Sequence, residues 1–346
     1  ALHLLRKSYP PIQVTAVFMN NWDASDQEEA ACTLDADYES ARRACHLMGV
    51  PLKRLSFRRE YWCRVFQRSI DAYNGGVETP NPDVLCNREI KFGVLLDWAQ
   101  SNGYDTLATG HYARTAYLEG QRKSVLIQAK DKHKDQTYFL SQIRCNTSRL
   151  IFPLGDHCKS EVRGIAHSLG MDWLLRRPES MGICFVGQAK KFASFLQQYL
   201  EFGTSGEFID LETGNVVGIH RGLPYYTIGQ AAKLPSKLHK YYVARKEGIS
   251  NTIFVVPTRA HSVLNPSKLK VADWNRFVDV PLSVGNIFCT IRSEDKDGIR
   301  VKQISESYIE LDKPIYAPAP GQFAVLYQEQ NGGRRICLGS AKIVSE

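Results

Sequence analysis

The sequence of 346 residues contains no apolar run near the roughly 20 residues that a membrane-spanning helix needs. It shows no signal or transit peptide, no internal repeat and no low-complexity stretch. Its nine cysteines form no Cys-x-x-Cys pair and no Cys/His grouping with the spacing of a zinc site. These absences disfavour a membrane protein, a structural metal and a disulfide-stapled secreted domain, so we expect a reducing compartment.

The sequence begins with Ala1 rather than Met, so we expect the gene to begin upstream, where a targeting segment would lie outside the given sequence. Lys and Arg exceed Asp and Glu to give a net charge of +8, without a basic tail. This excess permits a polyanionic partner such as nucleic acid without requiring one. A local cluster of like charge comprises Arg122, Lys123, Lys130, Lys132 and Lys134. Such a run is most often a solvated face.

Hydrophobic spacing divides the sequence into three parts. Up to about residue 205, short apolar segments such as 13–19 and 106–111 alternate with stretches of helical spacing. This alternation predicts an α/β fold with a doubly wound, mostly parallel sheet. From Gly206 onward, short alternating segments separated by Gly, Pro and Asn predict small β domains. We therefore expect a catalytic domain over residues 1–205 and two β-rich domains over 206–274 and 275–346.

One short segment has the composition of a reactive site. Pro80 and Pro82 fix φ and favour extended backbone before them, which predicts a stiff loop leading into a helix. Asp83 lies three residues before Cys86 in this segment. A carboxylate beside a thiol on rigid backbone suits acid/base-assisted thiol chemistry. The alternative is that Cys86 is a buried small hydrophobic residue, as most cysteines outside disulfides are.

Two predicted strands end at residues that would share one rim of the sheet. Met19 ends the first of these strands, and Gly110 and His111 end the other. Ligands of open α/β sheets bind beyond the carboxyl ends of the strands, so such a rim could hold a nucleotide. Met19 as core filling and His111 as a satisfied structural histidine are the simpler alternatives.

Nine segments, in order along nearly the whole chain, share the motifs of one family. They are 17–23 (VFMNNWD), 79–87 (TPNPDVLCN), 90–93 (IKFG), 108–114 (ATGHYAR), 134–142 (KDQTYFLSQ), 151–155 (IFPLG), 180–187 (SMGICFVG), 226–230 (YTIGQ) and 320–322 (PGQ). Together these segments resemble the tRNA-specific 2-thiouridylases, which use ATP to place sulfur on the wobble uridine of certain tRNAs. Each motif alone is weak evidence, whereas nine in register are a strong signal.

The resemblance implies a fold and a chemistry. The first domain would be an ATP-pyrophosphatase domain, similar to the adenine nucleotide alpha hydrolases, and the last a β-barrel that docks tRNA. ATP, with Mg²⁺, would adenylate the uridine C2 oxygen before a persulfide sulfur attacks that carbon. Cys184 is the implied persulfide carrier, loaded by an upstream sulfur-relay protein. Cys86 is the implied partner thiol, which either frees sulfide from the persulfide or closes a transient disulfide with Cys184.

The resemblance also implies binding roles. Asp83 would be the acid/base group, and with Asn81 and Pro82 it would shape the pocket for the flipped-out base. Met19 and Gly110 would contact ATP, the glycine letting the backbone approach the ligand closely. The implied tRNA contacts are His111, Lys134, Asp135, Gln136, Arg292 and Gln322. A lysine at position 134 suits a phosphate contact.

The chain departs from the family pattern in three places. The pyrophosphate-binding loop, a Ser-Gly-Gly-Val-Asp-Ser type sequence, is absent, and we expect a truncated sequence that binds ATP poorly rather than a different enzyme. Residues 231–234 (AAKL) stand where bacterial members have an Arg-Lys-Gly run, which is more similar to eukaryotic mitochondrial members. Arg292 is followed by Ser293 where the family has a tyrosine. We therefore expect a monomer of the mitochondrial matrix, or of the cytoplasm if the chain is bacterial.

Two alternatives stay open at this point. The chain could be another ATP-pyrophosphatase ligase that acts on a small molecule and needs no paired thiols. It could also be a catalytically inactive tRNA-binding fragment, since the pyrophosphate loop is absent. The cysteines to which the resemblance gives no role are interpreted as structural: Cys32, Cys45, Cys63, Cys145, Cys158, Cys289 and Cys337.

Overall fold

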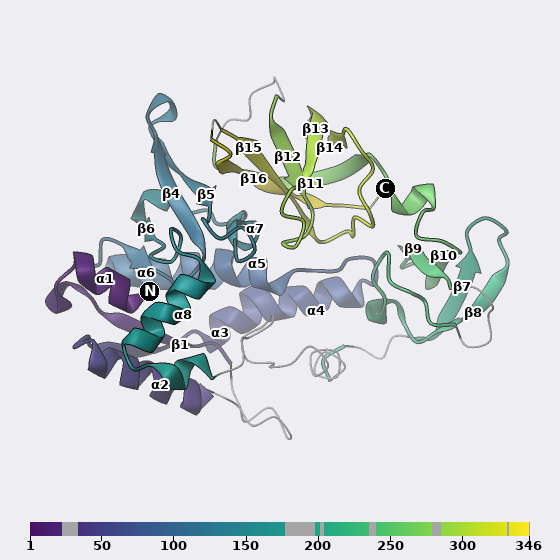
Figure 1. Cartoon of the computed structure of the whole chain (residues 1–346). Helices are drawn as coiled ribbons and strands as arrows, with labels where there is room; N and C mark the ends of the chain where they lie inside the picture. Colours follow the sequence, from purple (N-terminus) through teal and green to yellow (C-terminus); the bar gives the residue numbers. More distant parts are fainter. Residues whose placement is uncertain are drawn as a thin grey trace. The chain divides into compact units, whose positions relative to one another are not determined.

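The computed structural model describes residues 1–22, 34–176, 198–200, 204–234, 240–278, 285–330 and 332–345. The chain divides into two compact units, whose elements are labelled in Figure 1. The first unit comprises Ala1–Phe66, Asp83–Ala189 and Arg334–Cys337. The second comprises Gln67–Pro82, Lys190–Gly333 and Leu338–Glu346.

Parallel strand pairs characterise the first unit. Strand β1 (Ala16–Asn20) pairs with β2 (Leu52–Ser56), and β3 (Leu107–Ala108) pairs with β6 (Leu150–Ile151). Parallel neighbours need a crossover, and α2 (Leu34–Leu47) supplies it between β1 and β2. Further helices of this unit include α1 (Leu2–Ser8), η1 (Pro11–Gln13), α7 (Thr137–Leu140), η6 (Thr147–Arg149), α8 (Lys159–Ser168) and α9 (Asp172–Leu175). The predicted α/β fold is confirmed, and the parallel strands of this unit's described residues form two pairs.

Two helical runs contain π-helical segments. The first run is α3 (Arg58–Tyr61), η3 (Trp62–Phe66) and α4 (Gln67–Asn74), and the second is α5 (Pro82–Cys86), η4 (Asn87–Val94) and α6 (Leu95–Ser101). At the end of η4, the backbone N–H of Leu95 donates to the carbonyl of Ile90, five residues earlier. A Cβ on Gly93 would lie 2.9 Å from the Arg88 carbonyl oxygen, so this tight turn requires glycine. π-Helical segments are rare and often occur at functional sites.

The segment of Asp83 and Cys86 differs from the sequence-based prediction. Pro82 is the first residue of α5, so both Asp83 and Cys86 lie on a helix. Proline is favourable at this first position because its fixed φ suits the helix and its missing N–H would have no partner there. The prediction of a loop at Asp83 and Cys86 was wrong. The predicted helix begins earlier than expected and includes both residues.

A β-hairpin was not foreseen. Strands β4 (Ala113–Leu118) and β5 (Lys123–Gln128) pair in antiparallel fashion through η5 (Glu119–Gln121) and project from the first unit in Figure 1. Arg122 closes the turn in the left-handed region with φ of 51°. Ile336, at the start of β16 (Arg335–Ile343), pairs with Ile127 of β5. Residues distant in sequence thus extend the hairpin, a pairing that local patterns cannot indicate.

The second unit is built from β-strands, as predicted. Its first sheet has the order β8 (Val216–His220), β7 (Gly206–Asp210), β10 (Thr252–Val256) and β9 (Tyr242–Glu247). A closed barrel has the order β11 (Lys268–Arg276), β14 (Tyr308–Leu311), β13 (Ile299–Ile304), β12 (Ile287–Thr290), β15 (Phe323–Glu329) and β16, and β16 pairs back with β11. Short helices η7 (Leu223–Tyr225) and η8 (Ser262–Leu264) connect strands. The predicted boundaries at 205 and 274 stay predictions.

The described cysteines are mostly buried thiols. Burial raises the pKa of Cys145 to about 11 and that of Cys289 to about 12, which suits the structural role expected for them. Cys63 differs, because it is exposed on η3. Cys32 and Cys184 lie outside the described residues. Within the part of the chain that the structure describes, no group of His, Cys, Asp or Glu could hold a metal ion, and no helix combines the length and apolar character of a membrane span.

Candidate active site

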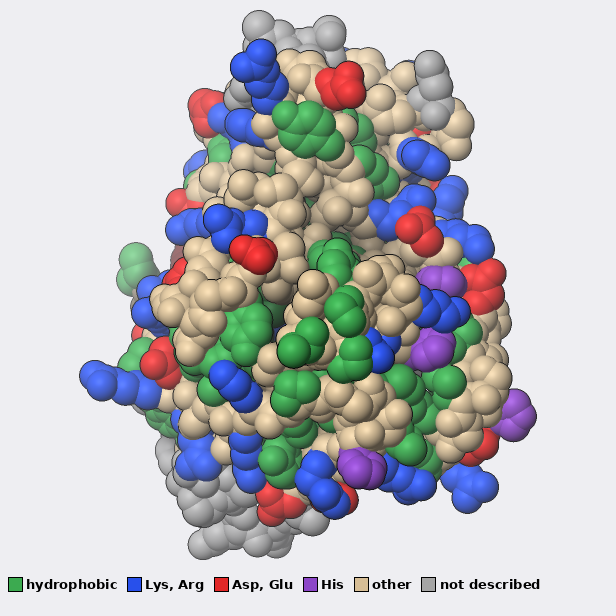
Figure 2. Space-filling view, turned by 90° about the vertical axis from the view of Figure 1, so that its left-hand side faces the viewer, with side chains coloured by type: hydrophobic (Ala, Val, Ile, Leu, Met, Phe, Trp, Pro, Cys, Tyr) green, Lys and Arg blue, Asp and Glu red, His purple; other side chains and the backbone are tan. Residues whose placement is uncertain are grey.

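A cavity of about 1010 Å³ opens in the first unit beside α1, β1, β3 and η4. Its lining includes Met19, Gly110 and His111, and also Lys91 and Gln136. The structure therefore brings together the two strand ends that the sequence placed on one rim. Figure 2 faces the side of the molecule on which α1 lies in Figure 1, and hydrophobic side chains gather near the middle of that view with Lys, Arg and His around them.

His111 is a buried, neutral member of the cavity lining. Its side chain is 9% exposed, and its ring lies 5.7 Å from that of Phe92 and 6.3 Å from that of Phe152. The Nδ1 atom is 2.8 Å from the hydroxyl oxygen of Thr109. Burial, with a smaller contribution from the positive charge of Lys91, lowers the pKa of His111 to about 3. The imidazole therefore carries no charge at neutral pH and can act in the cavity as a neutral hydrogen-bonding group.

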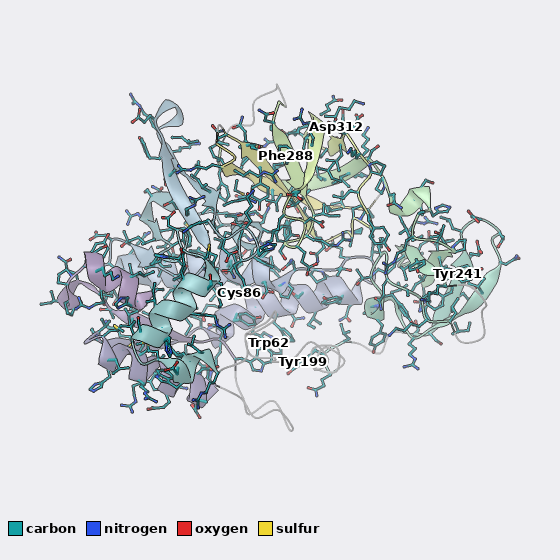
Figure 3. All side chains as sticks on the ribbon, in the orientation of Figure 1. Trp62, Cys86, Tyr199, Tyr241, Phe288 and Asp312 are labelled. Atoms are coloured by element: carbon teal, nitrogen blue, oxygen red, sulfur yellow. The ribbon has the colours of Figure 1, made fainter. Side chains whose placement is uncertain are left out.

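Asp83 and Cys86 are packed into α5. Burial raises the pKa of the Asp83 carboxyl, and the positive charge of Lys91 opposes that rise. Cys86, labelled in Figure 3, is 8% exposed. A carboxyl group with a raised pKa exchanges its proton at a higher pH than an exposed aspartate, which suits it to general acid/base catalysis. The predicted partner Cys184 lies outside the described residues, so the pairing of the two thiols stays a prediction.

The segment Lys134, Asp135 and Gln136 is held by hydrogen bonds within the first unit. One oxygen of Asp135 accepts from the backbone N–H of Ala129 at 2.8 Å, and the other accepts from the Thr137 hydroxyl at 2.6 Å. The Gln136 side-chain oxygen accepts from the N–H of Tyr112 at 2.9 Å. These bonds fix the backbone beside the cavity. The role of the three residues as tRNA contacts stays a prediction.

In the second unit, Gln322 binds the segment that precedes α5. Its side-chain N–H groups donate to the carbonyl of Thr79 at 2.7 Å and to that of Pro80 at 3.3 Å. Its side-chain oxygen accepts from the amide of Asn81 at 3.2 Å. Gly321, with φ of +90°, allows this approach, because a Cβ there would lie 3.0 Å from backbone atoms of Thr79. The predicted tRNA contact Gln322 therefore also positions the predicted base-binding residue Asn81.

Substitution of Gln322 tests this positioning. Gln322→Ala removes three hydrogen bonds, which should lower the free energy of unfolding by about 1–3 kcal/mol. Displacement of Asn81 should also raise KM for tRNA. Thermal unfolding and steady-state kinetics measure the two effects. The control is Gln330→Ala, which removes an exposed hydrogen bond to Gln328 and should change neither quantity; equal behaviour of the two variants would contradict the assignment.

Arg292 also bonds to its own chain. Its two terminal nitrogens donate to the carbonyls of Tyr316 at 2.9 Å and Ala317 at 2.8 Å, and its guanidinium lies 6.0 Å from the Tyr316 ring. These contacts tie the end of β12 to the segment before β15. The predicted contact of Arg292 with tRNA stays a prediction.

Comparison with known proteins identifies the family. Models described as tRNA methyl transferase HUP domain, tRNA methyl transferase PRC-barrel domain and Aminomethyltransferase beta-barrel domain match residues 1–188, 193–257 and 252–343. Mitochondrial tRNA-specific 2-thiouridylase 1 of Drosophila melanogaster is 41% identical over 99% of this chain and 90% of its own length. The chain belongs to the tRNA-specific 2-thiouridylase family.

Other tRNA-specific 2-thiouridylases are similarly close. The chain is 39% identical to tRNA-specific 2-thiouridylase MnmA 1 of Geobacillus kaustophilus, over 95% of this chain and 88% of the relative. It is 35% identical to the human mitochondrial enzyme, over 99% of this chain and 86% of that protein. The resemblance based on nine short motifs is thus confirmed over the full chain. The family uses ATP and acts on tRNA, and several relatives are named as mitochondrial.

Two residues of η4 received no role from the sequence, and one of them lines the cavity. One is Lys91, which lines the cavity and acts electrostatically on both His111 and Asp83. The other is Arg88, whose guanidinium donates to the side-chain oxygen of Gln142 at 3.3 Å. Lys91 lies in the motif at 90–93, and Arg88 directly follows the motif at 79–87. The sequence assigned them no role, because a lysine or arginine on a helix is usually solvated. The place of Lys91 in the cavity lining, on the π-helix η4, is what distinguishes it.

Proposed function

We propose that this tRNA-specific 2-thiouridylase replaces the C2 oxygen of the wobble uridine with sulfur in an ATP-dependent reaction. The observation that carries the proposal is the run α5–η4. It places Asp83 and Cys86 on the same helical run as Lys91, which lines the cavity with Met19, Gly110 and His111. An acid/base group, a thiol and a nucleotide-sized cavity are thereby joined through one rigid element.

The cavity suits ATP. A volume of about 1010 Å³ lies at the upper end of the range for small-molecule sites. Gly110 leaves its backbone open, because a Cβ there would meet only Leu154, at 3.9 Å. Asp105 is the one carboxylate side chain in the described lining. Mg²⁺ would therefore be held mainly by the phosphates of ATP, as this hard ion often is.

The uridine must be activated before sulfur can enter. The C2 oxygen attacks the α-phosphorus of ATP, so that a C2–O–P linkage forms and pyrophosphate leaves with the electrons of the broken P–O bond. AMP is then a far better leaving group from C2 than the original oxygen. Asn81 and Pro82 shape the pocket for the extruded base. Asp83 serves as the general acid/base that accepts or gives up a proton during the reaction.

Sulfur enters from a persulfide on Cys184, loaded by a sulfur-relay protein. In one route, the Cys86 thiolate attacks the Cys184 sulfur, closes a Cys86–Cys184 disulfide and frees sulfide, which attacks C2 and expels AMP. In the other, the terminal persulfide sulfur attacks C2 directly, and Cys86 then cleaves the S–S bond to leave the thiocarbonyl. Both routes end in a disulfide, so a thiol reductant supplies two electrons to restore the enzyme.

The tRNA is bound by residues of both units. Lys134, His111, Asp135, Gln136, Arg292 and Gln322 are the proposed contacts. Lys134 and Arg292 are the members whose charge suits a phosphate. The hydrogen bonds of Asp135 hold the backbone beside Lys134 in the first unit, and those of Gln322 hold residues 79–81 in the second. The names of the mitochondrial relatives support action in the mitochondrial matrix.

Analysis of the modified nucleoside tests this function. The full-length protein, incubated with tRNA, ATP and a persulfide-loaded relay protein, should yield 2-thiouridine at the wobble position and one AMP for each sulfur inserted. Mass spectrometry of digested tRNA distinguishes an exchange of oxygen for sulfur from the gain of a methyl group. Release of AMP without formation of 2-thiouridine would support the activation step alone. Binding of tRNA without release of AMP would contradict an enzymatic role.

A further inference from the structure

Lys91 presents an ammonium group to the cavity. It lies on η4, is half-buried and belongs to the cavity lining. Within the described residues, no hydrogen bond or ion pair involves this ammonium, whereas its neighbours Arg88 and Glu89 pair with each other at 2.9 Å. A partly buried ammonium without a protein partner can be compensated by an anion that enters the cavity and replaces the water lost there. The ammonium is therefore available to an anion at this position.

The other groups around Lys91 do not supply that anion. His111 is neutral and carries no negative charge. Asp83 forms no ion pair with Lys91 within 4.0 Å in the described residues. Among the described lining residues, Lys91 is the one Lys or Arg side chain, and Asp105 the one carboxylate. A phosphate group in the cavity would thus find a single cationic side chain there.

The π-helix determines where Lys91 lies. In a helix with i→i+5 hydrogen bonds, residues five apart stand near one another on the same side. Cys86 and Lys91 are separated by five positions, at the entry to η4 and within it. In a regular α-helix, with 3.6 residues per turn, the same two residues would diverge around the axis. Lys91 is thereby kept on the side of the helix that carries the thiol, and Gly93 permits the turn.

We propose that Lys91 binds the α-phosphate of ATP, which is the phosphate that becomes joined to the uridine, and so links the nucleotide cavity to Asp83. This inference rests on the proposed ATP-dependent function. The α-phosphate is favoured over the outer phosphates because Lys91 also acts electrostatically on Asp83, on the side where the base is bound. The ammonium stabilises the phosphate both in ATP and in the adenylated uridine.

Binding of AMP and of adenosine to the full-length protein tests the proposal by calorimetry. Lys91→Met keeps the length of the side chain without its charge and should weaken AMP binding by at least about tenfold, or ~1.4 kcal/mol. Adenosine, which has no phosphate, should bind both proteins equally. Lys91→Arg should restore AMP binding to within about threefold, since it retains the charge. The exposed Lys313→Met is the matched control and should change nothing.

The outcomes separate the inference from the function on which it rests. Unchanged AMP affinity in Lys91→Met would overturn the assignment of Lys91, while nucleotide binding in the cavity would stand. Failure of the unmodified protein to bind either AMP or adenosine would overturn the nucleotide site itself. Gly93→Ala, whose Cβ would press on the Arg88 carbonyl, should reproduce the selective loss of AMP binding. Retained AMP binding in that variant would contradict the role of the π-turn.

Discussion

Asp83→Asn should reduce 2-thiouridine formation by about 10²–10⁴-fold, the usual contribution of a general acid or base. The substitution preserves the shape of the side chain but removes the proton that it exchanges. Because burial raises the pKa of Asp83, its limb in the pH–rate profile should lie above the ordinary range of an aspartate. That limb should vanish in Asp83→Asn. Single-turnover rates measured between pH 4 and 9 test this, since that window of about five pH units includes the pKa values of carboxyl groups and histidine.

Stability measurements show whether this loss reflects unfolding. A carboxyl whose pKa is raised by folding destabilises the folded state when it ionises, so stability falls as pH rises from the unfolded pKa through the folded pKa. Asp83→Asn should therefore be at least as stable as the original protein at neutral pH. The control Asp71→Asn, on the exposed face of α4, should leave activity and its pH profile unchanged. Full activity of Asp83→Asn would contradict its catalytic role.

Cys86→Ser and Cys184→Ser should each abolish thiolation, with losses of more than about 10³-fold, as for other covalent nucleophiles. Their intermediates should differ. In Cys86→Ser, sulfur should remain on Cys184, because the thiol that cleaves the S–S bond is missing. Mass spectrometry of the Cys184 peptide after loading with sulfur should show this adduct. Cys184→Ser should carry no adduct at either position.

The exposed Cys63 provides a matched control for these variants. Cys63→Ser should form 2-thiouridine at the original rate. All variants should retain ATP-dependent release of pyrophosphate, because activation precedes sulfur transfer, whereas AMP leaves C2 only when sulfur attacks that carbon. An adduct on Cys86 in the Cys184→Ser protein would reverse the assigned roles, and undiminished thiolation in Cys184→Ser would contradict the persulfide mechanism.

The sequence predicted the fold where the signal is local. Hydrophobic alternation indicated β1, β2 and the strands of the second unit. Turn residues indicated the change from α/β to β-rich sequence at Gly206. The hairpin β4–β5 escaped prediction because its pairing with Ile336 connects residues far apart in the chain. The helix that carries Asp83 was taken as loop, since Pro80 and Pro82 suggest extended backbone, although proline also begins helices.

The candidate site was predicted in composition but not in geometry. Motifs gave Met19, Gly110, His111 and Asp83, whereas the neutral state of His111 depends on the rings of Phe92 and Phe152. Lys91 stood in a recognised motif without a role, because only the π-helical register indicates where its side chain lies. The bonds of Gln322 to Thr79 and Asn81 likewise span the second unit and leave no local sequence signal.

The bonds between Gln322 and residues 79–81 impose an order on folding during synthesis. Thr79 donates its N–H to the carbonyl of Pro320 at 2.7 Å, and Gln322 donates to the Thr79 carbonyl across 243 positions. The ribosome releases the N-terminal part of a chain first, at about 5–20 residues per second, so this segment waits many seconds for its partner. A premature stop codon before position 320 would therefore leave Asn81 without its support even though most of the chain had been made.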